Sequence, residues 1–370
     1  MVENYKNSQS HSCFNSRRSI ASAMLRYLPL LSQVIVLVLS ASVTEQKEAP
    51  AKVPTCLDVD GYNVCHYKGV LVDVTQRRFE DRLEIGDLDL LAIREDAFKN
   101  LTATHLYLNQ GNRISVLKRE SFRGLPMLKW LHLDSNVVPL SGHLFAELGN
   151  LQSLSLVFNK INSIPADSFA GLSKLTWLYL GHNDIASVDA DSFSYPNPEL
   201  LFLWLNNNKI TRIEPGAFAS LTELNRLYLD HNKLQDLQAG VFQGLNKLEV
   251  LYLNDNQLTS VTRPLFRGLV DLKKLYLQHN EISTLEAGTF QELSQLEQLY
   301  LGKNKLSHIV VGAFAGILEL QVLDLSDNNI HTADNVIFEG LTKLRLLKID
   351  SNSTEKQIGD SSTTPATFTL

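Results

Sequence analysis

The chain has 370 residues, 44% of them hydrophobic, and a formal net charge of −6. A chain of this length would ordinarily form two or three globular domains. The mild acidity gives no reason to expect nucleic acid as a partner, because proteins that bind it present clustered positive charge. An internal repeat along most of the chain argues instead for a single elongated domain.

Residues 1–43 have the order of a secretory signal peptide. Arg26 precedes an apolar run over 28–39, and the small residues Ser40, Ala41 and Ser42 follow it. The run is short for a membrane span. We therefore expect a leader over 1–43 and a secreted, extracellular product, with Met1 and Met24 both open as the start. The alternative is an uncleaved signal anchor that holds the chain at a membrane.

A segment over 44–80 contains two cysteines and precedes the repeats. Asp60-Gly61 favours a two-residue hairpin turn, and counting outward from this turn places Cys56 opposite Cys65. Cysteines paired in this way across antiparallel strands lie at a separation that suits a disulfide. Because Cys13 lies in the leader, the mature chain would hold one disulfide and no free thiol, as expected in an oxidising compartment.

From about residue 81 to 352 the chain repeats every 24 residues with the pattern LxxLxxLxLxxNxIxxIxxxxFxx. The LxL segment alternates, so it predicts a short strand with both leucines on one side. Strands recurring at a fixed period stack into a parallel sheet, while the leucine, isoleucine and phenylalanine columns point inward. The coil around Leu83 fits without its asparagine, which gives about twelve coils and a sheet on the order of 55 Å long.

One asparagine in each coil stands where the strand ends. Its amide has two donors and an acceptor, so it can satisfy backbone groups of its own coil and of the adjacent one. Those groups would otherwise be buried without partners. We predict a buried ladder that consists of Asn112, Asn136, Asn159, Asn183, Asn208, Asn232, Asn256, Asn280, Asn304 and Asn328.

Two sequences match the N-glycosylation acceptor, at Asn100-Leu101-Thr102 and Asn352-Ser353-Thr354. Asn352 also continues the asparagine column, and a glycan there is incompatible with a buried ladder. Either the final coil is frayed or the acceptor is unused. The tail over 353–370 is polar and rich in serine and threonine, and it lacks an apolar segment for a membrane span or lipid anchor.

These columns resemble the leucine-rich repeat, in the 24-residue variety common in extracellular animal proteins. The resemblance implies an α/β solenoid, a right-handed superhelix with a concave parallel β-sheet and a mostly irregular convex side. Residues 44–80 resemble the N-terminal cap of such proteins, with two cysteines in place of the usual four. The resemblance also implies a role in innate immunity, extracellular matrix contact or cell-surface recognition.

The sequence shows no sign of catalysis. GxGxxG, P-loop, HExxH and CxxC motifs are absent, so we predict neither catalytic residues nor a cofactor. His182, His231 and His279 share the position before a ladder asparagine. They are two coils apart, roughly 10 Å, which is too far to share a metal. We interpret them as surface turn residues and predict no metal site.

The exposed side of the predicted sheet is the informative surface. The residue between the two strand leucines points away from the core, and it is aromatic in six consecutive coils. All three tryptophans fall on this face, and such a water-facing group usually marks an interaction surface. The predicted ligand-binding residues are Trp130, Phe158, Trp177, Tyr179, Phe202, Trp204, Tyr228, Tyr252, Tyr276 and Tyr300. In the alternative interpretation these rings only stack on one another and stabilise the sheet.

The sequence therefore favours a secreted, non-enzymatic protein that presents a concave face to a protein ligand. Two alternatives stay open. One is a membrane-tethered adhesion or receptor ectodomain held by the uncleaved leader. The other is a homodimer in which the aromatic face is self-complementary.

Overall fold

The computed structural model describes residues 53–195, 197–331, 335–349 and 356–357. Pro54–Leu370 forms one compact unit. The predicted leader over 1–43 and the acceptor at Asn352 lie outside the described residues. So does the predicted tail over 353–370, apart from residues 356–357.

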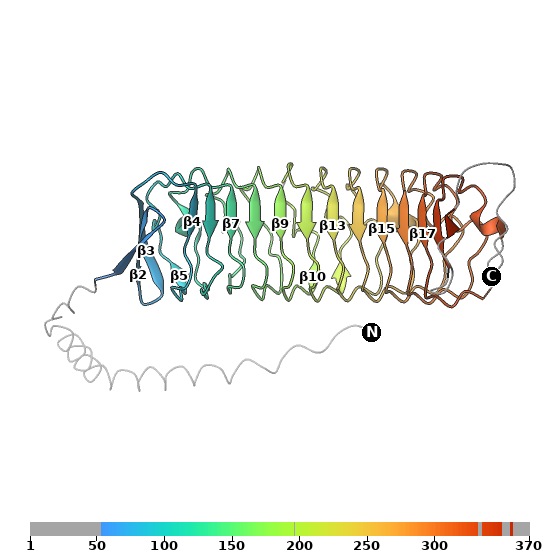
Figure 1. The fold of residues 1–370 in the computed structure, drawn as a ribbon, viewed down its shortest axis with the longest axis horizontal. Helices are drawn as coiled ribbons and strands as arrows, with labels where there is room; N and C mark the ends of the chain where they lie inside the picture. The colour runs from blue at the N-terminus through green and yellow to red at the C-terminus, as the bar shows by residue number, and fades with distance from the viewer. Residues whose placement is uncertain (1–52, 196, 332–334, 350–355, 358–370) are drawn as a thin grey trace, which may run out of the picture. The chain divides into compact units, whose positions relative to one another are not determined.

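Twelve parallel strands follow one another in chain order and form one long sheet (Figure 1). The chain makes about eleven turns between them, which confirms the predicted solenoid. The strands have three residues each and are β4 (Arg82–Glu84), β6 (His105–Tyr107), β7 (Trp130–His132), β8 (Ser153–Ser155), β9 (Trp177–Tyr179), β11 (Phe202–Trp204), β13 (Arg226–Tyr228), β14 (Val250–Tyr252), β15 (Lys274–Tyr276), β16 (Gln298–Tyr300), β17 (Val322–Asp324) and β18 (Leu346–Lys348). A thirteenth strand, β19 (Lys356–Gln357), pairs antiparallel with β18.

The register of the sheet is constant although the coils differ in length. Leu131 pairs with Leu154 across a coil of 23 residues, and Leu178 pairs with Leu203 across a coil of 25. These two coils therefore absorb the missing or extra residue outside the paired strands, and no strand pairing is disturbed. Each central leucine points into the core, so its two neighbours in the strand point to the opposite, outer face of the sheet.

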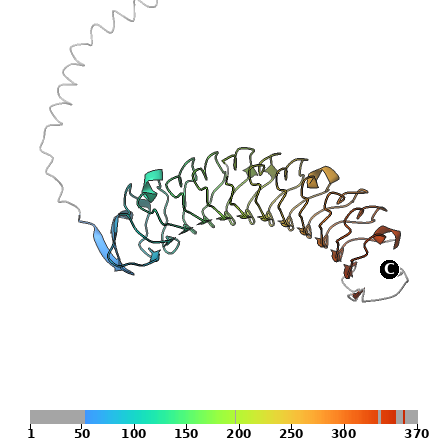
Figure 2. The same cartoon turned by 90° about the horizontal axis from the view of Figure 1, so that it is seen from above.

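The return side of the solenoid is mostly irregular. Its regular elements are the short strands β5 (Ala92–Ile93), β10 (Ser187–Val188) and β12 (Arg212–Ile213) and the 3₁₀ helices η1 (Arg119–Phe122), η2 (Arg263–Phe266) and η3 (Asn335–Phe338). No α-helix occurs in the described residues. Within this unit the long sheet lines the inner, concave side of the curve and the 3₁₀ helices lie on the outer side (Figure 2).

The core is a single continuous cluster that runs the length of the solenoid. The strand leucines are fully buried, and so is a column of phenylalanines on the return side. Rings of that column follow one another from coil to coil; Phe290 and Phe314, for example, lie 6.2 Å apart between centroids. Because each coil is too thin to cover its own apolar side chains, burial requires the next coil.

The asparagine ladder connects each coil to the one before it. Asn256 Oδ1 accepts a hydrogen bond of 3.1 Å from the Leu234 N–H of the preceding coil. Its Nδ2 donates to the Leu229 carbonyl of the preceding coil at 3.0 Å and to the Leu253 carbonyl of its own coil at 3.1 Å. The other nine predicted asparagines make an equivalent set of bonds, and all ten are buried except Asn328, which is half-buried.

The N-terminal end of the core is covered by a four-stranded sheet. β1 (Thr55–Val59) and β2 (Tyr62–Tyr67) form the predicted hairpin around Asp60-Gly61, with Cys56 opposite Cys65 and a disulfide between them. The third strand, β3 (Val70–Gln76), was not predicted; it pairs with β2 on one side and with β5 on the other. Tyr62, Val64, Leu71 and Val74 are fully buried and continue the core of the repeats.

We expect the ladder to contribute measurably to stability. Replacing Asn256 with Ala leaves the buried Leu234 N–H without a partner and removes one of the two amide donors of the Leu229 and Leu253 carbonyls, at a cost of about 1–3 kcal/mol. Urea-induced unfolding, followed by tryptophan fluorescence, measures this loss. Ser260→Ala, at an exposed site of the same coil, is the control. Equal midpoints for the two variants would show that the asparagine bonds do not support the coil.

Candidate functional site

Six aromatic rings form a continuous stack along the concave face, here called the ring stack. Centroids of adjacent rings are 4.1 to 5.0 Å apart and the ring planes are within 14° of parallel. The spacing follows from the sheet, whose strands are about 4.8 Å apart. The ring stack consists of Tyr179, Trp204, Tyr228, Tyr252, Tyr276 and Tyr300, and each ring is half-buried.

Burial in the ring stack raises the pKa of four of its phenols. It raises the pKa of Tyr252 to about 12, and the neighbouring phenols of Tyr276 and Tyr228 contribute in the same direction. The pKa values of Tyr179, Tyr276 and Tyr300 are raised by burial as well. These four phenols are thus neutral hydrogen-bonding groups throughout the physiological range.

A second group of rings lies beside the ring stack, toward the start of the strands. Trp130 and Trp177 meet edge to face, with centroids 6.0 Å apart, although β8 lies between their strands. They can meet because β8 carries the small Ser153 at this position. Trp177 also lies parallel to Phe202 at 6.2 Å, and Phe202 is 5.9 Å from Trp204. We name Trp130, Trp177 and Phe202, together with Trp204 of the ring stack, the tryptophan cluster.

Phe158, another of the predicted ligand-binding residues, makes its ring contact outside the tryptophan cluster. It occupies the position before a ladder asparagine, where the backbone is left-handed with φ of 58°. This conformation directs the side chain away from the strand face. The ring stacks on His182 in the next coil at 4.5 Å and is 56% exposed.

A hollow of roughly 520 Å³ opens in the concave face over β8. It is lined by the outward side chains of β6, β7, β8 and β9 together with Asp134. Its floor consists of Ser153 and Ser155, both buried, whereas the flanking strands carry rings. We name it the β8 hollow. In the sequence, the only sign of this hollow is Ser155, a serine at the outward position between the strand leucines where the next six coils have an aromatic residue.

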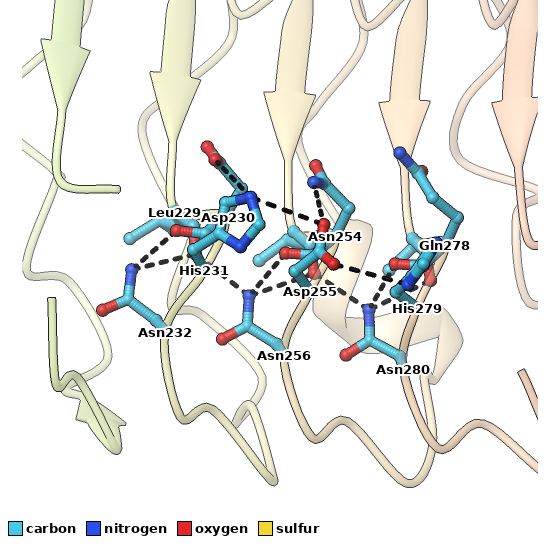
Figure 3. A network of polar contacts seen from close by, with 12 residues as sticks. Leu229, Asp230, His231, Asn232, Asn254, Asp255, Asn256, Gln278, His279 and Asn280 are labelled. Carbon is cyan, nitrogen blue, oxygen red and sulfur yellow. Dashed lines mark hydrogen bonds and ion pairs between the residues drawn. The ribbon is translucent and has the colours of Figure 1, made fainter. Parts of the chain in front are cut away.

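A row of polar side chains crosses three coils just beyond the C-terminal ends of β13, β14 and β15 (Figure 3). Asp255 lies between two histidines, 3.7 Å from His231 Nε2 and 3.5 Å from His279 Nδ1, and accepts a 2.7 Å hydrogen bond from Asn254 Nδ2. The sequence shows the histidines in one column but not that an aspartate bridges them. In the described part of the chain, no three His, Cys, Asp or Glu side chains form a group suited to a metal ion.

Three buried oxygens in this row have no hydrogen-bond partner within the described residues. They are Asp230 Oδ1, Asn254 Oδ1 and Gln278 Oε1, one from each successive coil. Burial raises the pKa of the Asp230 carboxyl, and nearby Asp255 adds to this effect while His231 opposes it.

The predicted acceptor at Asn100 is exposed, on a turn with φ of 56°. Its acceptor threonine, Thr102, is exposed too. Glycosylation at Asn100 remains a prediction. The described residues contain no helix with the length and apolarity needed to cross a membrane.

The chain belongs to the leucine-rich repeat family, whose model, described as "Leucine rich repeat", matches overlapping segments from residue 81 to residue 353. The match covers all twelve parallel strands of the long sheet. No protein of the curated set matches the chain.

Solved structures of leucine-rich repeat proteins are similar in fold. The structure of the TLR13–ssRNA13 complex has a TM-score of 0.54 and 24% sequence identity over 73% of this chain. The aligned region spans 46% of that TLR13 chain, so this chain corresponds to about half of it. A leucine-rich repeat protein of Leptospira interrogans has a TM-score of 0.51 and 27% identity, with 67% of each chain covered.

The ring stack makes stability depend on alkaline pH. Because the folded-state pKa of Tyr252, about 12, lies above its ordinary value of 10.0, the neutral phenol favours folding. This contribution is fully present below pH 10 and is lost as pH rises through about 12. Urea unfolding at pH 9 and at pH 11.5 should show this loss, and it should be smaller in Tyr252→Phe. Tyrosinate absorbance that rises at the same pH in the folded and the urea-unfolded chain would contradict the prediction.

Proposed function

We propose that the chain is a secreted, non-enzymatic protein that binds a protein ligand through its concave face. The observation that carries the proposal is the joined surface of the ring stack and the tryptophan cluster. All three tryptophans of the chain and five of its tyrosines lie there. Half-buried rings of this kind add large contact area on binding and lose little rotational freedom, as binding hot spots do.

Support comes from the family as well as from the surface. Leucine-rich repeats are usually non-catalytic binding scaffolds, and no enzyme family matches the chain. The disulfide between Cys56 and Cys65 fits an oxidising, extracellular compartment. The RNA of the TLR13 complex is not carried over, because a net charge of −6 gives no electrostatic reason for it. The setting we infer is extracellular recognition, in innate immunity, matrix contact or at the cell surface.

Removing two central rings tests the proposed surface. We expect Trp177→Ala combined with Trp204→Ala to weaken partner binding by more than about 2 kcal/mol, because both indoles lie in the centre of the surface. The partner is isolated by affinity capture on the wild-type chain from extracellular material of the native tissue. Its affinity for both chains is then measured by calorimetry, and their melting temperatures are compared.

The control is Met127→Ala with Leu318→Ala, which removes exposed apolar side chains from turns outside the sheet. Its affinity should equal that of the wild type. If the tryptophan variant keeps its affinity while its melting temperature falls, the rings have a structural role and the ligand binds elsewhere. Capture of a second copy of the chain alone would favour the homodimer.

Export is tested separately. The leader predicts that mass spectrometry of the protein from the medium finds an N-terminus between Ser42 and Glu45. A matched chain with Arg in place of Ile35 and Val36, within the apolar run, should stay inside the cell. The intact leader in a membrane pellet would instead support the tethered receptor.

A further inference from the structure

The outward column of the sheet that forms the ring stack is interrupted once, at β8. His132 of β7, Ser155 of β8 and Tyr179 of β9 are adjacent in register. His132 stacks on Tyr107 at 4.6 Å, and Tyr179 stacks on Trp204 at 4.1 Å. Two rigid pairs of rings therefore face each other across the serine.

The width of this interruption suits one flat group. Two strand spacings separate His132 from Tyr179, which is about 9.6 Å. A planar group midway between them would lie about 4.8 Å from each ring. Adjacent rings within the ring stack have nearly the same separation, 4.1 to 5.0 Å. The β8 hollow is open to solvent at this place, and its floor of buried serines leaves the depth for a side chain.

The hollow also contains a carboxylate with one oxygen available. Asp134 Oδ1 accepts hydrogen bonds from the Ser155 hydroxyl and, at 2.8 Å, from the Val157 N–H. Asp134 Oδ2 lies 3.6 Å from His132 Nδ1, beyond hydrogen-bond distance, and the side chain is 22% exposed. The carboxylate is thus held in place through one oxygen while the other faces the hollow.

Among the described residues, the only basic group within ion-pair distance of this carboxylate is His132. Arg82 lies over the outer face of Tyr107, 4.3 Å from its centroid, and pairs with Glu84 at 2.9 Å. Burial lowers the pKa of His105, so this imidazole is neutral at physiological pH. His132, whose ring forms one wall of the hollow, pairs with Asp134 only when it is protonated.

We propose that the β8 hollow binds an arginine side chain of the protein ligand, stacked between His132 and Tyr179 and hydrogen-bonded to Asp134. A guanidinium is planar, stacks on aromatic faces and carries N–H donors for a carboxylate. A phenyl ring has the right thickness but would leave Asp134 Oδ2 desolvated without a donor, and an indole offers only one uncharged N–H. An ammonium group supplies charge but no plane. This inference rests on the proposed binding function of the concave face and adds the residue type that the face selects.

Small probes test the site without the natural ligand. N-acetyl-arginine-N-methylamide and its neutral isostere, N-acetyl-citrulline-N-methylamide, are titrated separately into the chain. Binding is followed by the fluorescence of Trp130 and Trp177 and by ring-current shifts of the probe protons in NMR. We expect the arginine probe to bind at least about tenfold more tightly, because its hydrogen bond to Asp134 is charge-assisted. Equal affinities for the two probes, or tighter binding of N-acetyl-tyrosine-N-methylamide, would overturn the proposal.

Two variants separate the contributions of charge and shape. Asp134→Asn keeps an oxygen for the Ser155 hydroxyl and the Val157 N–H, and it should abolish the preference for arginine over citrulline. Asp230→Asn is the matched control, since Asp230 has the same position in its coil and lies outside the hollow. Ser155→Tyr completes the ring column and should abolish probe binding while the melting temperature holds or rises. Probe binding unchanged by Ser155→Tyr or by Asp134→Asn would contradict the assignment.

The outcomes distinguish this proposal from the function on which it rests. If the Trp177 and Trp204 double variant loses the partner while the arginine probe shows no preference, the concave surface stands and the arginine site fails. If the probe behaves as expected but the double variant keeps the partner, the proposed binding surface fails. Loss of the partner in Ser155→Tyr together with loss of the probe supports both.

Discussion

Each turn of this solenoid leaves backbone groups and apolar side chains uncovered until the next turn is in place. The asparagine ladder supplies hydrogen bonds to the backbone groups that are buried between turns. Asn256 bonds at once to its own coil and to two groups of the coil before it. An apolar residue would fill the same space but leave the Leu234 N–H unpaired and each of the two carbonyls with one donor fewer. Stability is therefore shared between neighbours, and the ends need separate cover. At the N-terminal end the β1–β2–β3 sheet gives that cover with four fully buried side chains.

The same in-register stacking determines the chemistry of the concave face. Identical positions in successive coils lie one strand spacing apart, so aromatic rings in one column must stack. Charged side chains at the same position of successive coils are also neighbours, and here opposite charges pair, as Lys247 with Glu223 and Lys305 with Glu281 show. Such exposed pairs add little stability. The rings matter more for binding, because a ligand meets side chains whose freedom the stack has already restricted.

The structural and binding interpretations of the rings are thus compatible. Stacking accounts for the raised pKa of Tyr252 and for the parallel planes. It does not account for the tryptophan cluster, where Trp130 reaches across β8 to meet Trp177 edge to face. That arrangement depends on one small residue, Ser153, in a column whose other members vary. A repeat needs no such contact for its own stability.

What could be predicted from the sequence follows from periodicity. The strand leucines, the ladder and the hairpin register all depend on spacing alone, and the structure has them where the spacing places them. Features outside the period could not be predicted in this way. β3 belongs to no repeat, so its pairing with β2 and β5 has no counterpart elsewhere in the chain. The aspartate between His231 and His279 depends on side-chain directions at a left-handed turn, and Phe158 leaves the strand face for the same reason.

A perfectly regular face would have a difficulty in recognition. Moving a ligand along the ring stack by one coil places it on nearly the same surface, so tyrosines alone define no unique position, much as a uniform strand defines no register. Specificity requires a feature that occurs once. The β8 hollow is such a feature, because only there in the described sheet does a serine take the outward position between rings, next to the carboxylate of Asp134. In a ligand anchored at that place, the β8 hollow would fix the position along the sheet, and the ring stack would supply most of the contact area.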